Sequence, residues 1–370
     1  MSWDHFQNSR TIPEAHKKIS CYAPFNHMRI RRDGDMSPCC FSKKKLRWKQ
    51  GKVGLKDYWF GSLNEEYQLA MLNKKLHSGC GHEDRPHTCG NLIKNKIIPP
   101  INDYDHNAGE DRLQHALNSI FGDSTSMPKV FEFEISNLCN MACPMCMGNL
   151  SSKHMLGRDK DLMKYEPNVF DDDDNLNELI DQFKEFIPHL DEIRFVGGEP
   201  FAHKGFFKIC NMIADINPDM SVQVCTNGSV YNKKVEKIFK QNKLKLSVSI
   251  DTVIPEEYKQ IRIGGQYQQT FENIQKFKHK AQSVMINATI MSINVGNISK
   301  FFHYAIENNL ETFINTYSRL GRSNSPDWSL NRVDKSILQK SIEELESIES
   351  DLHSSQIHQT IKLIQNSLLD

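Results

Sequence analysis

An alternation of strand-like and helix-like segments between residues 130 and 317 restricts the fold of this chain more than any other feature. In the first segment, Phe131, Phe133 and Ile135 occupy one face of an expected strand, with glutamates between them. The expected strands are residues 130–136, 193–196, 222–225, 244–250, 285–291 and 312–317, and the expected helices are residues 176–187, 205–216, 233–241, 258–280 and 299–308. Strands alternating with helices predict an α/β fold, a partial (β/α)6 TIM-like barrel with parallel strands and right-handed crossovers.

Three parts are expected along the chain. Residues 128–325 hold the barrel. Residues 1–127 contain short β-like runs, turns and five cysteines, and are expected to form a separate module that ends in a polar linker and a short helix, Leu113–Phe121. In residues 326–370 apolar side chains recur at helical spacing, which predicts a C-terminal helical extension.

Composition excludes some classes of partner. The chain has 46 basic and 46 acidic residues, so its net charge gives no sign of nucleic-acid binding. No run of about 18 apolar residues predicts a membrane span, and the start, MSWDHFQNSR, lacks the pattern of a secretory signal. A cytoplasmic location is expected, where clustered cysteines more often bind metal or do redox chemistry than form disulfides.

Three cysteines follow the first expected strand. Cys139, Cys143 and Cys146 have the spacing C-x3-C-x2-C. Three thiolates this close can hold three corners of a [4Fe–4S] cube and leave the fourth iron open to bind and activate a ligand. The alternative is a structural zinc site completed by a distant fourth ligand.

A glycine-rich segment follows the second expected strand and reads Gly197-Gly198-Glu199-Pro200. Adjacent glycines let the backbone approach a ligand closely, and Glu199 suits a ligand amine. The alternative is an ordinary turn before a helix.

The third and fourth expected strands also end in polar residues. Asn227 lies in the turn that follows the third strand. In the fourth, Ser249 and Asp251 alternate with apolar residues, although a buried parallel strand is nearly all apolar. These side chains suit sugar hydroxyls, and the alternative is a solvated edge.

Taken in their order, these segments resemble the radical S-adenosylmethionine (radical SAM) superfamily. The resemblance covers residues 130–319 and rests on FEISNLCNMACPMC, VGGEP, CTNG, VSID and YKQIRIGG. It implies that Cys139, Cys143 and Cys146 ligate a [4Fe–4S] cluster whose fourth iron is chelated by S-adenosylmethionine. It also implies reductive cleavage of that cofactor to a 5′-deoxyadenosyl radical, which removes a hydrogen atom from the substrate.

The resemblance also implies roles for the other segments. Gly197, Gly198, Glu199 and Pro200 would meet the methionine amine, and Asn227 would belong to the same cofactor site. Ser249 and Asp251 would lie near the ribose, Arg262 would contact the carboxylate, and residues 287–291 would line the adenine.

The N-terminal cysteines resemble the SPASM and twitch modules that hold auxiliary iron–sulfur clusters. Asp33-Gly34 predicts a hairpin turn, and the expected ligands of a second [4Fe–4S] cluster are Cys21, Cys39 or Cys40, Cys80 and Cys89, with Cys39 favoured by the spacing G-x4-C. The module precedes the barrel, whereas such modules usually follow it, and its second half has fewer cysteines than usual, with His82 and His87 between Cys80 and Cys89. The alternative is a structural zinc site.

Two further features carry weaker expectations. Cys225 shares a strand face with Gln223, where a thiol can return a hydrogen atom to a substrate radical, and the alternative is a core cysteine. A long insertion with His154 and the acidic run Asp171–Asp174 follows the cluster loop. The acidic run is expected to be a solvated loop, and the insertion suits a lid.

Three functions are compatible with these features. The first is a radical SAM enzyme that modifies a peptide or protein with the help of one auxiliary cluster. The second is a radical SAM dehydrogenase of a small carbohydrate-like alcohol, and the third is a non-catalytic iron–sulfur redox or sensor protein, which would gain nothing from an open iron. The first two need a reducing partner such as flavodoxin or ferredoxin, and an exposed cluster predicts oxygen sensitivity.

Overall fold

The computed structural model describes residues 3–8, 10, 12–81, 88–94, 109–121, 126–157, 168–317 and 326–369. The chain divides into two compact units. The first unit comprises residues 1–135, 167–194 and 212–220, and the second comprises residues 136–166, 195–211 and 221–370.

The first unit contains strands in the order β3-β2-β1-β4-β5. Its strands are β1 (His27–Arg31), β2 (Asp35–Ser37), β3 (Leu46–Arg47), β4 (Val130–Glu134) and β5 (Glu192–Phe195, whose last residue belongs to the second unit). Its helices are α1 (Trp3–Asn8), α2 (Ala23–Asn26), α3 (Leu55–Trp59), α4 (Ser62–Leu72), α5 (Cys89–Lys94), α7 (Gly109–Phe121) and α9 (Asp173–Phe183), with short 3₁₀ turns at η1 (Glu14–His16), η2 (Val169–Asp171) and η3 (Ile187–His189).

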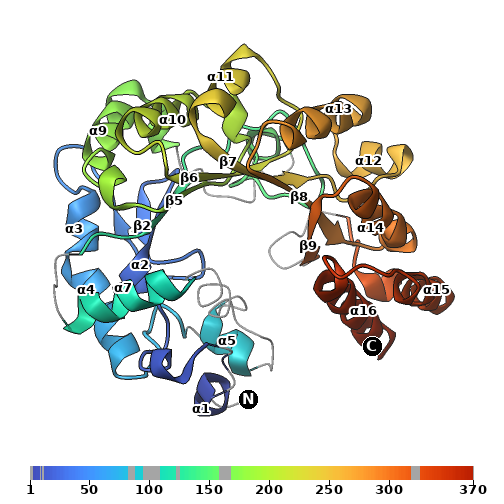
Figure 1. Ribbon diagram of the computed structural model, residues 1–370, viewed down its shortest axis with the longest axis horizontal. Coiled ribbons are helices and arrows are strands. Elements are labelled where there is room, and N and C mark those ends of the chain that lie inside the picture. The colour runs from blue at the N-terminus through green and yellow to red at the C-terminus, as the bar shows by residue number, and fades with distance from the viewer. Residues whose placement is uncertain are drawn as a thin grey trace. The chain divides into compact units, whose positions relative to one another are not determined.

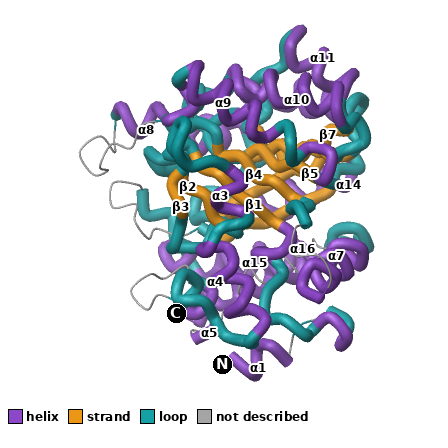
Figure 2. The backbone as a smooth tube through the Cα atoms, turned by 90° about the vertical axis from the view of Figure 1, so that its left-hand side faces the viewer, coloured by secondary structure: helices purple, strands orange, loops and turns teal. Residues whose placement is uncertain are grey.

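The predicted N-terminal hairpin is present. Strands β1 and β2 pair antiparallel, with Ile30 opposite Met36. The chain turns at Gly34, whose φ of +83° lies in the left-handed region that favours glycine. Strand β1 also pairs with β4 in parallel, from His27 opposite Val130 to Arg31 opposite Glu134. Figure 2 shows these two strands side by side.

Opposite faces of this sheet carry different chemistry, because side chains alternate along each strand. On one face, Phe131 packs edge-on against Phe183 of α9, with ring centroids 4.9 Å apart. On the other face, Arg29 of β1 forms ion pairs with Glu132 and Glu134 of β4 at 2.7 and 2.5 Å. The first face is therefore the core side of this unit.

The second unit contains parallel strands in the order β6-β7-β8-β9. Its strands are β6 (Ser221–Thr226), β7 (Lys243–Ser249), β8 (Ser283–Ile290) and β9 (Glu311–Thr316). Its helices are α8 (Ser152–Leu156), α10 (Lys204–Ile216, whose last turn belongs to the first unit), α11 (Lys233–Gln241), α12 (Pro255–Ile261), α13 (Tyr267–Lys278), α14 (Ile298–Glu307), α15 (Lys335–Glu346) and α16 (Ser354–Leu369), with 3₁₀ turns at η4 (Pro200–Ala202), η5 (Val295–Asn297) and η6 (Leu330–Arg332).

Each strand of the second unit has one apolar and one polar side. Val224, Leu246, Ile286 and Ile314 lie on the apolar side and are all buried, and Figure 1 shows helices α13 and α14 on one side of β7, β8 and β9. The alternate residues form what is called here the polar strand face: Ser221, Gln223, Cys225, Lys243, Lys245, Ser247, Ser249, Ser283, Met285, Asn287, Thr289, Glu311, Phe313 and Asn315.

The predicted fold class is confirmed: the protein is an α/β chain whose parallel strands alternate with helices, and the set of strands in neither unit closes on itself. The helix predicted over residues 258–280 is two helices, α12 and α13. The interruption has a local cause, because Gly264 takes a φ of +92° and its backbone lies against the carbonyl of Asn140.

The expected domain boundaries at residues 127 and 325 stay predictions.

The acidic run after the cluster loop begins a helix. Asp172 caps α9 by accepting a hydrogen bond from the backbone N–H of Asn175 (2.9 Å). Most of the insertion expected to act as a lid, residues 158–167, lies outside the described residues. Within the described ranges no helix is both long and apolar enough to cross a membrane.

Candidate metal centres and cofactor site

The three cysteines of the C-x3-C-x2-C loop lie together in the second unit. Cys139, Cys143 and Cys146 pack into one apolar cluster that includes Ile261 of α12. The backbone N–H of Cys146 donates to the carbonyl of Cys143 (2.8 Å), which folds the loop back on itself. The thiols of Cys143 and Cys139 lie close enough to Cys146 to raise the pKa of its thiol. The loop therefore brings the three cysteines near one another, as a cluster with three protein ligands would require, while the described side chains are not grouped closely enough in this structure to hold a metal ion.

These thiols are desolvated. Burial raises the pKa of all three, and that of Cys146 to about 12. A thiol must lose its proton to bind iron, so the positive charge of the metal has to offset this desolvation. For Cys143 the burial is partly offset by the protein, because the nearby guanidinium of Arg262 lowers the pKa of the thiol.

Arg262 is held beside Cys143 by Asp251. The Arg262 Nη1 lies 3.9 Å from the Cys143 sulfur, and its Nε lies 2.6 Å from the Asp251 carboxylate. The other Asp251 oxygen accepts a hydrogen bond from the backbone N–H of Thr289 (2.8 Å). Burial alone would lower the pKa of Arg262, but Asp251, Cys143 and Tyr258 together raise that pKa above its ordinary value. The pair places a fixed positive charge at the cysteine loop.

The glycine-rich segment is also anchored to the cysteine loop. Gly198 has a φ of +55°, and a Cβ there would lie 2.5 Å from the carbonyl oxygen of Leu138, beside Cys139. The backbone N–H of Glu199 donates to the same carbonyl (2.7 Å). Only glycine fits this approach at position 198 without a shift of the backbone.

The Glu199 carboxylate is buried and accepts hydrogen bonds from its own chain. The donors are the backbone N–H groups of Phe201 (3.0 Å) and Asn227 (2.7 Å) and the hydroxyl of Thr226 (2.9 Å). Burial raises the pKa of Glu199 to about 7, against the effect of these donors. The carboxylate therefore joins the glycine-rich segment to the turn after β6, and the predicted role of the GGEP segment toward a ligand amine stays a prediction.

Asn227 extends this connection to the cysteine loop. Its side-chain amide donates to Asn140 (2.9 Å) and lies 3.8 Å from the sulfur of Cys139. Asn140 in turn donates to the hydroxyl of Ser229 (2.9 Å). The turn after β6 and the cysteine loop are thus one hydrogen-bonded assembly.

Ser249 and Cys225 both lie on the polar strand face and are half-buried. Ser249 is opposite Asn287 of β8, whose amide donates to Ser247 (2.5 Å). Cys225 is opposite Ser247. The expected roles of Ser249 at a ribose and of Cys225 as a hydrogen-atom donor stay predictions.

Two residues near this site make contacts that could not be predicted from the sequence. The side-chain amide of Asn294, 1% exposed, donates to the Asp251 carbonyl and the Thr289 carbonyl, both at 2.9 Å. Buried His154 places its Nε2 2.7 Å from the carbonyl of Cys143. The position of Asn294 just after a strand is a weak sign of such a contact in the sequence. The contact of His154 gives no such sign, because it depends on how the cysteine loop folds back.

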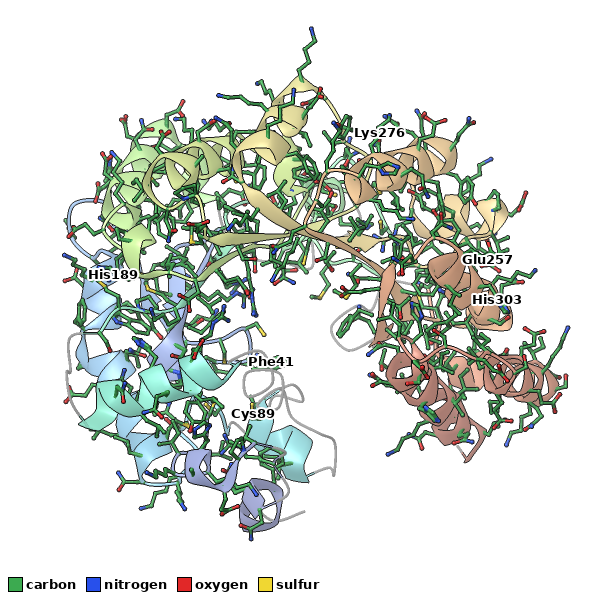
Figure 3. The ribbon with its side chains drawn as sticks, in the orientation of Figure 1. Phe41, Cys89, His189, Glu257, Lys276 and His303 are labelled. Carbon is green, nitrogen blue, oxygen red and sulfur yellow. The ribbon has the colours of Figure 1, made fainter. Side chains whose placement is uncertain are left out.

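The four N-terminal cysteines meet in the first unit. Cys21 packs against two apolar clusters, of which one includes Cys80 and the other includes Cys89. The backbone N–H of Gly90 donates to the Cys80 carbonyl (2.9 Å), and the thiol of Cys89 lies within electrostatic range of Cys21, Cys39 and Cys80. Figure 3 shows Cys89 beside Phe41, which packs against the same cluster.

Cys39 and Cys40 differ in their surroundings. Cys39 is buried and Cys40 is exposed. Burial, reinforced by the neighbouring thiol of Cys21, raises the pKa of Cys39 to about 12. His82 and His87 lie outside the described residues. In the part of the chain that the structure describes, no three His, Cys, Asp or Glu side chains are grouped so as to hold a metal ion.

Comparisons with known proteins agree with the two cysteine sites. A profile of the Radical SAM superfamily matches residues 133–305, and a profile of the SPASM iron-sulfur cluster-binding domain matches residues 21–91. A GTP 3',8-cyclase of Alkaliphilus oremlandii is 25% identical over 177 residues, which are 47% of this chain and 48% of that protein. The chain thus aligns with about half the length of this curated relative.

Two solved structures are similar to part of the chain. SuiB of Streptococcus suis bound to its precursor peptide SuiA has a TM-score of 0.44 and 15% identity, covering 70% of this chain and 56% of SuiB. Native anSMEcpe with bound AdoMet has a TM-score of 0.44 and 18% identity, covering 59% of this chain and 58% of that chain. The chain contains a Radical SAM superfamily domain in residues 133–305 and a SPASM iron-sulfur cluster-binding domain in residues 21–91.

Proposed function

We propose that the protein uses S-adenosylmethionine and two [4Fe–4S] clusters to modify a peptide, by removal of a hydrogen atom from one of its residues. The observation that carries this proposal is the cysteine loop, which gathers three thiols and no fourth beside Arg262 and Asn227 among the described residues. When bound, the cluster supplies the electron that cleaves S-adenosylmethionine to a 5′-deoxyadenosyl radical.

The chain's residues would bind and orient the cofactor. Backbone carbonyls of the segment Gly197–Glu199 suit the methionine amine, since the Glu199 carboxylate already has donors of its own. The Ser249 hydroxyl suits the ribose. One oxygen of Asp251 pairs with Arg262, so Asp251 would act there as a shared acceptor and Arg262 would face the cofactor carboxylate.

The second cluster would be held by Cys21, Cys39, Cys80 and Cys89. The four thiols lie within electrostatic range of one another. Four thiolates close the coordination of such a cluster, so this site suits electron transfer or anchoring more than chemistry at an open iron. The second cluster would accept the electron that the substrate radical releases when it is oxidised. Flavodoxin or ferredoxin would reduce the first cluster.

The polar strand face favours a peptide over a nucleoside triphosphate. Lys243, Lys245 and Glu311 are its charged members, two cations and one anion. A triphosphate would need several cations there. Phe313 is 42% exposed on the same face, as suits contact with a peptide side chain. A small carbohydrate-like alcohol, the other candidate, would use the hydroxyl and amide groups and would not need Phe313.

The first experiment tests the reaction class. Protein that is reconstituted with iron and sulfide without oxygen, then reduced and mixed with S-adenosylmethionine, should release 5′-deoxyadenosine. The variant Cys143→Ala should release none and keep the iron of the second cluster. Release that is equal in both proteins would contradict the assignment of the loop.

The second experiment tests the substrate class. Deuterated peptides, deuterated GTP and deuterated small alcohols are offered in parallel, and transfer of deuterium into 5′-deoxyadenosine identifies the hydrogen-atom donor. We expect transfer from a peptide and a loss of that transfer in Phe313→Ser, with uncoupled cleavage unchanged. Transfer from GTP or from an alcohol alone would replace the peptide proposal.

A further inference from the structure

We propose that the hydroxyl of Tyr58 donates a hydrogen bond to the auxiliary cluster, at a cluster sulfide or at the sulfur of Cys39 or Cys80, and thereby favours the reduced cluster. This inference rests on the proposed four-cysteine site. It assigns a positioning and tuning function to a residue outside the coordinating set.

The first observation is that Tyr58 is buried with an unused hydroxyl. Tyr58 lies in α3 and is 0% exposed. Among the described residues its hydroxyl oxygen has no hydrogen-bond partner. A buried hydroxyl without a partner is costly, and native proteins nearly always satisfy such a group with protein, water or a bound ligand.

The second observation is where the hydroxyl lies. It is within electrostatic range of the thiols of Cys39 and Cys80 and of the hydroxyl of Tyr67. Contacts of Tyr67 show where this second hydroxyl lies. The Tyr67 hydroxyl bonds to Ser42, three residues after Cys39, and a Cβ on Gly79, next to Cys80, would fall 2.0 Å from it. The Tyr58 hydroxyl is thus beside the tyrosine that bridges two of the cysteine-bearing loops.

The two tyrosines differ in what their hydroxyl groups are free to do. The Tyr67 hydroxyl already donates to the carbonyl of Lys44 (3.1 Å). The Tyr58 hydroxyl keeps its proton, because burial raises its pKa well above the usual value, and it has no other acceptor among the described residues. It is therefore a neutral donor near two cysteines whose sulfur atoms would carry negative charge once iron is bound.

Such a bond acts on the cluster's electron affinity. Reduction adds one negative charge to the cluster, and this charge strengthens a hydrogen bond to the cluster sulfur. Hydrogen bonds to charged groups are stronger than those between neutral groups. Hydrogen bonds to sulfur are one of the features that set iron–sulfur potentials. Loss of the Tyr58 hydroxyl should therefore make the auxiliary cluster harder to reduce.

The test is a reductive titration followed by electron paramagnetic resonance. The full chain carries Cys139→Ala, Cys143→Ala and Cys146→Ala, so that the auxiliary cluster alone gives a signal. Tyr58→Phe in this background should lower the ratio of reduced to oxidised cluster at a fixed potential by about tenfold, which is about 59 mV for one electron. Tyr67→Phe is the matched control, and it should change the ratio by less than half as much on a logarithmic scale.

The outcomes separate the two proposals. If the background protein binds no iron, the four-cysteine cluster is wrong and the function of Tyr58 falls with it. If iron is fully bound but Tyr58→Phe leaves the ratio unchanged, or Tyr67→Phe changes it equally, the cluster stands and the Tyr58 hydrogen bond is wrong.

Discussion

The two cysteine sites gather their sulfur atoms in different ways. Cys139, Cys143 and Cys146 come from eight consecutive residues, and the buried ion pair of Arg262 and Asp251 places a cation beside them. The four N-terminal cysteines come from segments spread over residues 21–89, and buried tyrosine hydroxyls lie beside them. The first arrangement would leave a corner open next to the Arg262 guanidinium, which suits the carboxylate of the cofactor, whereas the second would enclose its metal.

The largest expected effect comes from removing one thiol at each site. Cys143→Ala should abolish release of 5′-deoxyadenosine while the N-terminal site keeps its iron. Cys39→Ala should remove the N-terminal iron and leave cleavage of S-adenosylmethionine without substrate largely intact. Iron analysis and chromatography of the products check both.

Two variants control this comparison. Cys40→Ser should keep all iron, because Cys40 is exposed. Cys210→Ala should also keep it, because Cys210 is a buried cysteine of α10 outside both groups. Iron loss in Cys40→Ser with none in Cys39→Ala would exchange the assignment of these neighbours.

The next largest effect is expected from removing the Arg262 guanidinium, the cation that lies beside the C-x3-C-x2-C loop. Arg262→Met removes the cation 3.9 Å from the Cys143 sulfur and leaves the Asp251 carboxylate buried without its partner. Partners of metal ligands typically contribute 10–100-fold to affinity or activity, so we expect a loss of about that size in S-adenosylmethionine binding. Equilibrium binding to the reconstituted protein measures it. Unchanged binding would remove the electrostatic contrast between the two sites.

The cysteine loop could be predicted from the sequence because its spacing alone brings the thiols together, and the strands could be predicted because apolar residues such as Val224 and Leu246 alternate with polar ones. The grouping of the N-terminal cysteines was predicted from a hairpin and a following loop and from a resemblance, because the spacing of these cysteines alone does not bring them together. Two features could not be predicted: the hydrogen bond that the Glu199 carboxylate accepts from the backbone of Asn227, and the burial of the Tyr58 hydroxyl without a partner among the described residues. Both depend on contacts between segments far apart in the chain.

A smaller effect concerns pH and only the second unit. The folded pKa of Glu199, about 7, lies above its ordinary value of 4.5. The folded state therefore holds more protons between these values, and the free energy of unfolding falls as the pH rises from about 4.5 to about 7. Above pH 7 the free energy of unfolding should be lower by about 3 kcal/mol than it is below pH 4.5.

Glu199→Gln should remove this dependence on pH, since an amide does not titrate, while it lowers stability at every pH because the amide's NH₂ group faces backbone donors. Denaturant unfolding of the reconstituted protein from pH 5.5 to 8 measures it. Glu236→Gln, at a partly exposed glutamate of α11, should keep the slope of the unchanged protein. A slope that survives in Glu199→Gln would assign the dependence to another group.

The smallest effect separates backbone strain from contact with the cysteine loop. Gly264 and Gly51 both have positive φ, +92° and +61°, so alanine at either position should cost about 1 kcal/mol or somewhat more. A Cβ at Gly264 would also lie 3.0 Å from the Asn140 carbonyl, in the loop that holds the three thiols, whereas nothing lies within 4 Å of a Cβ at Gly51. Gly264→Ala should therefore slow cleavage of S-adenosylmethionine several-fold, and Gly51→Ala should lower stability equally without slowing it. Equal rates in the two variants would mean that the loop tolerates displacement, so that the open corner would depend less on a fixed backbone than the geometry indicates.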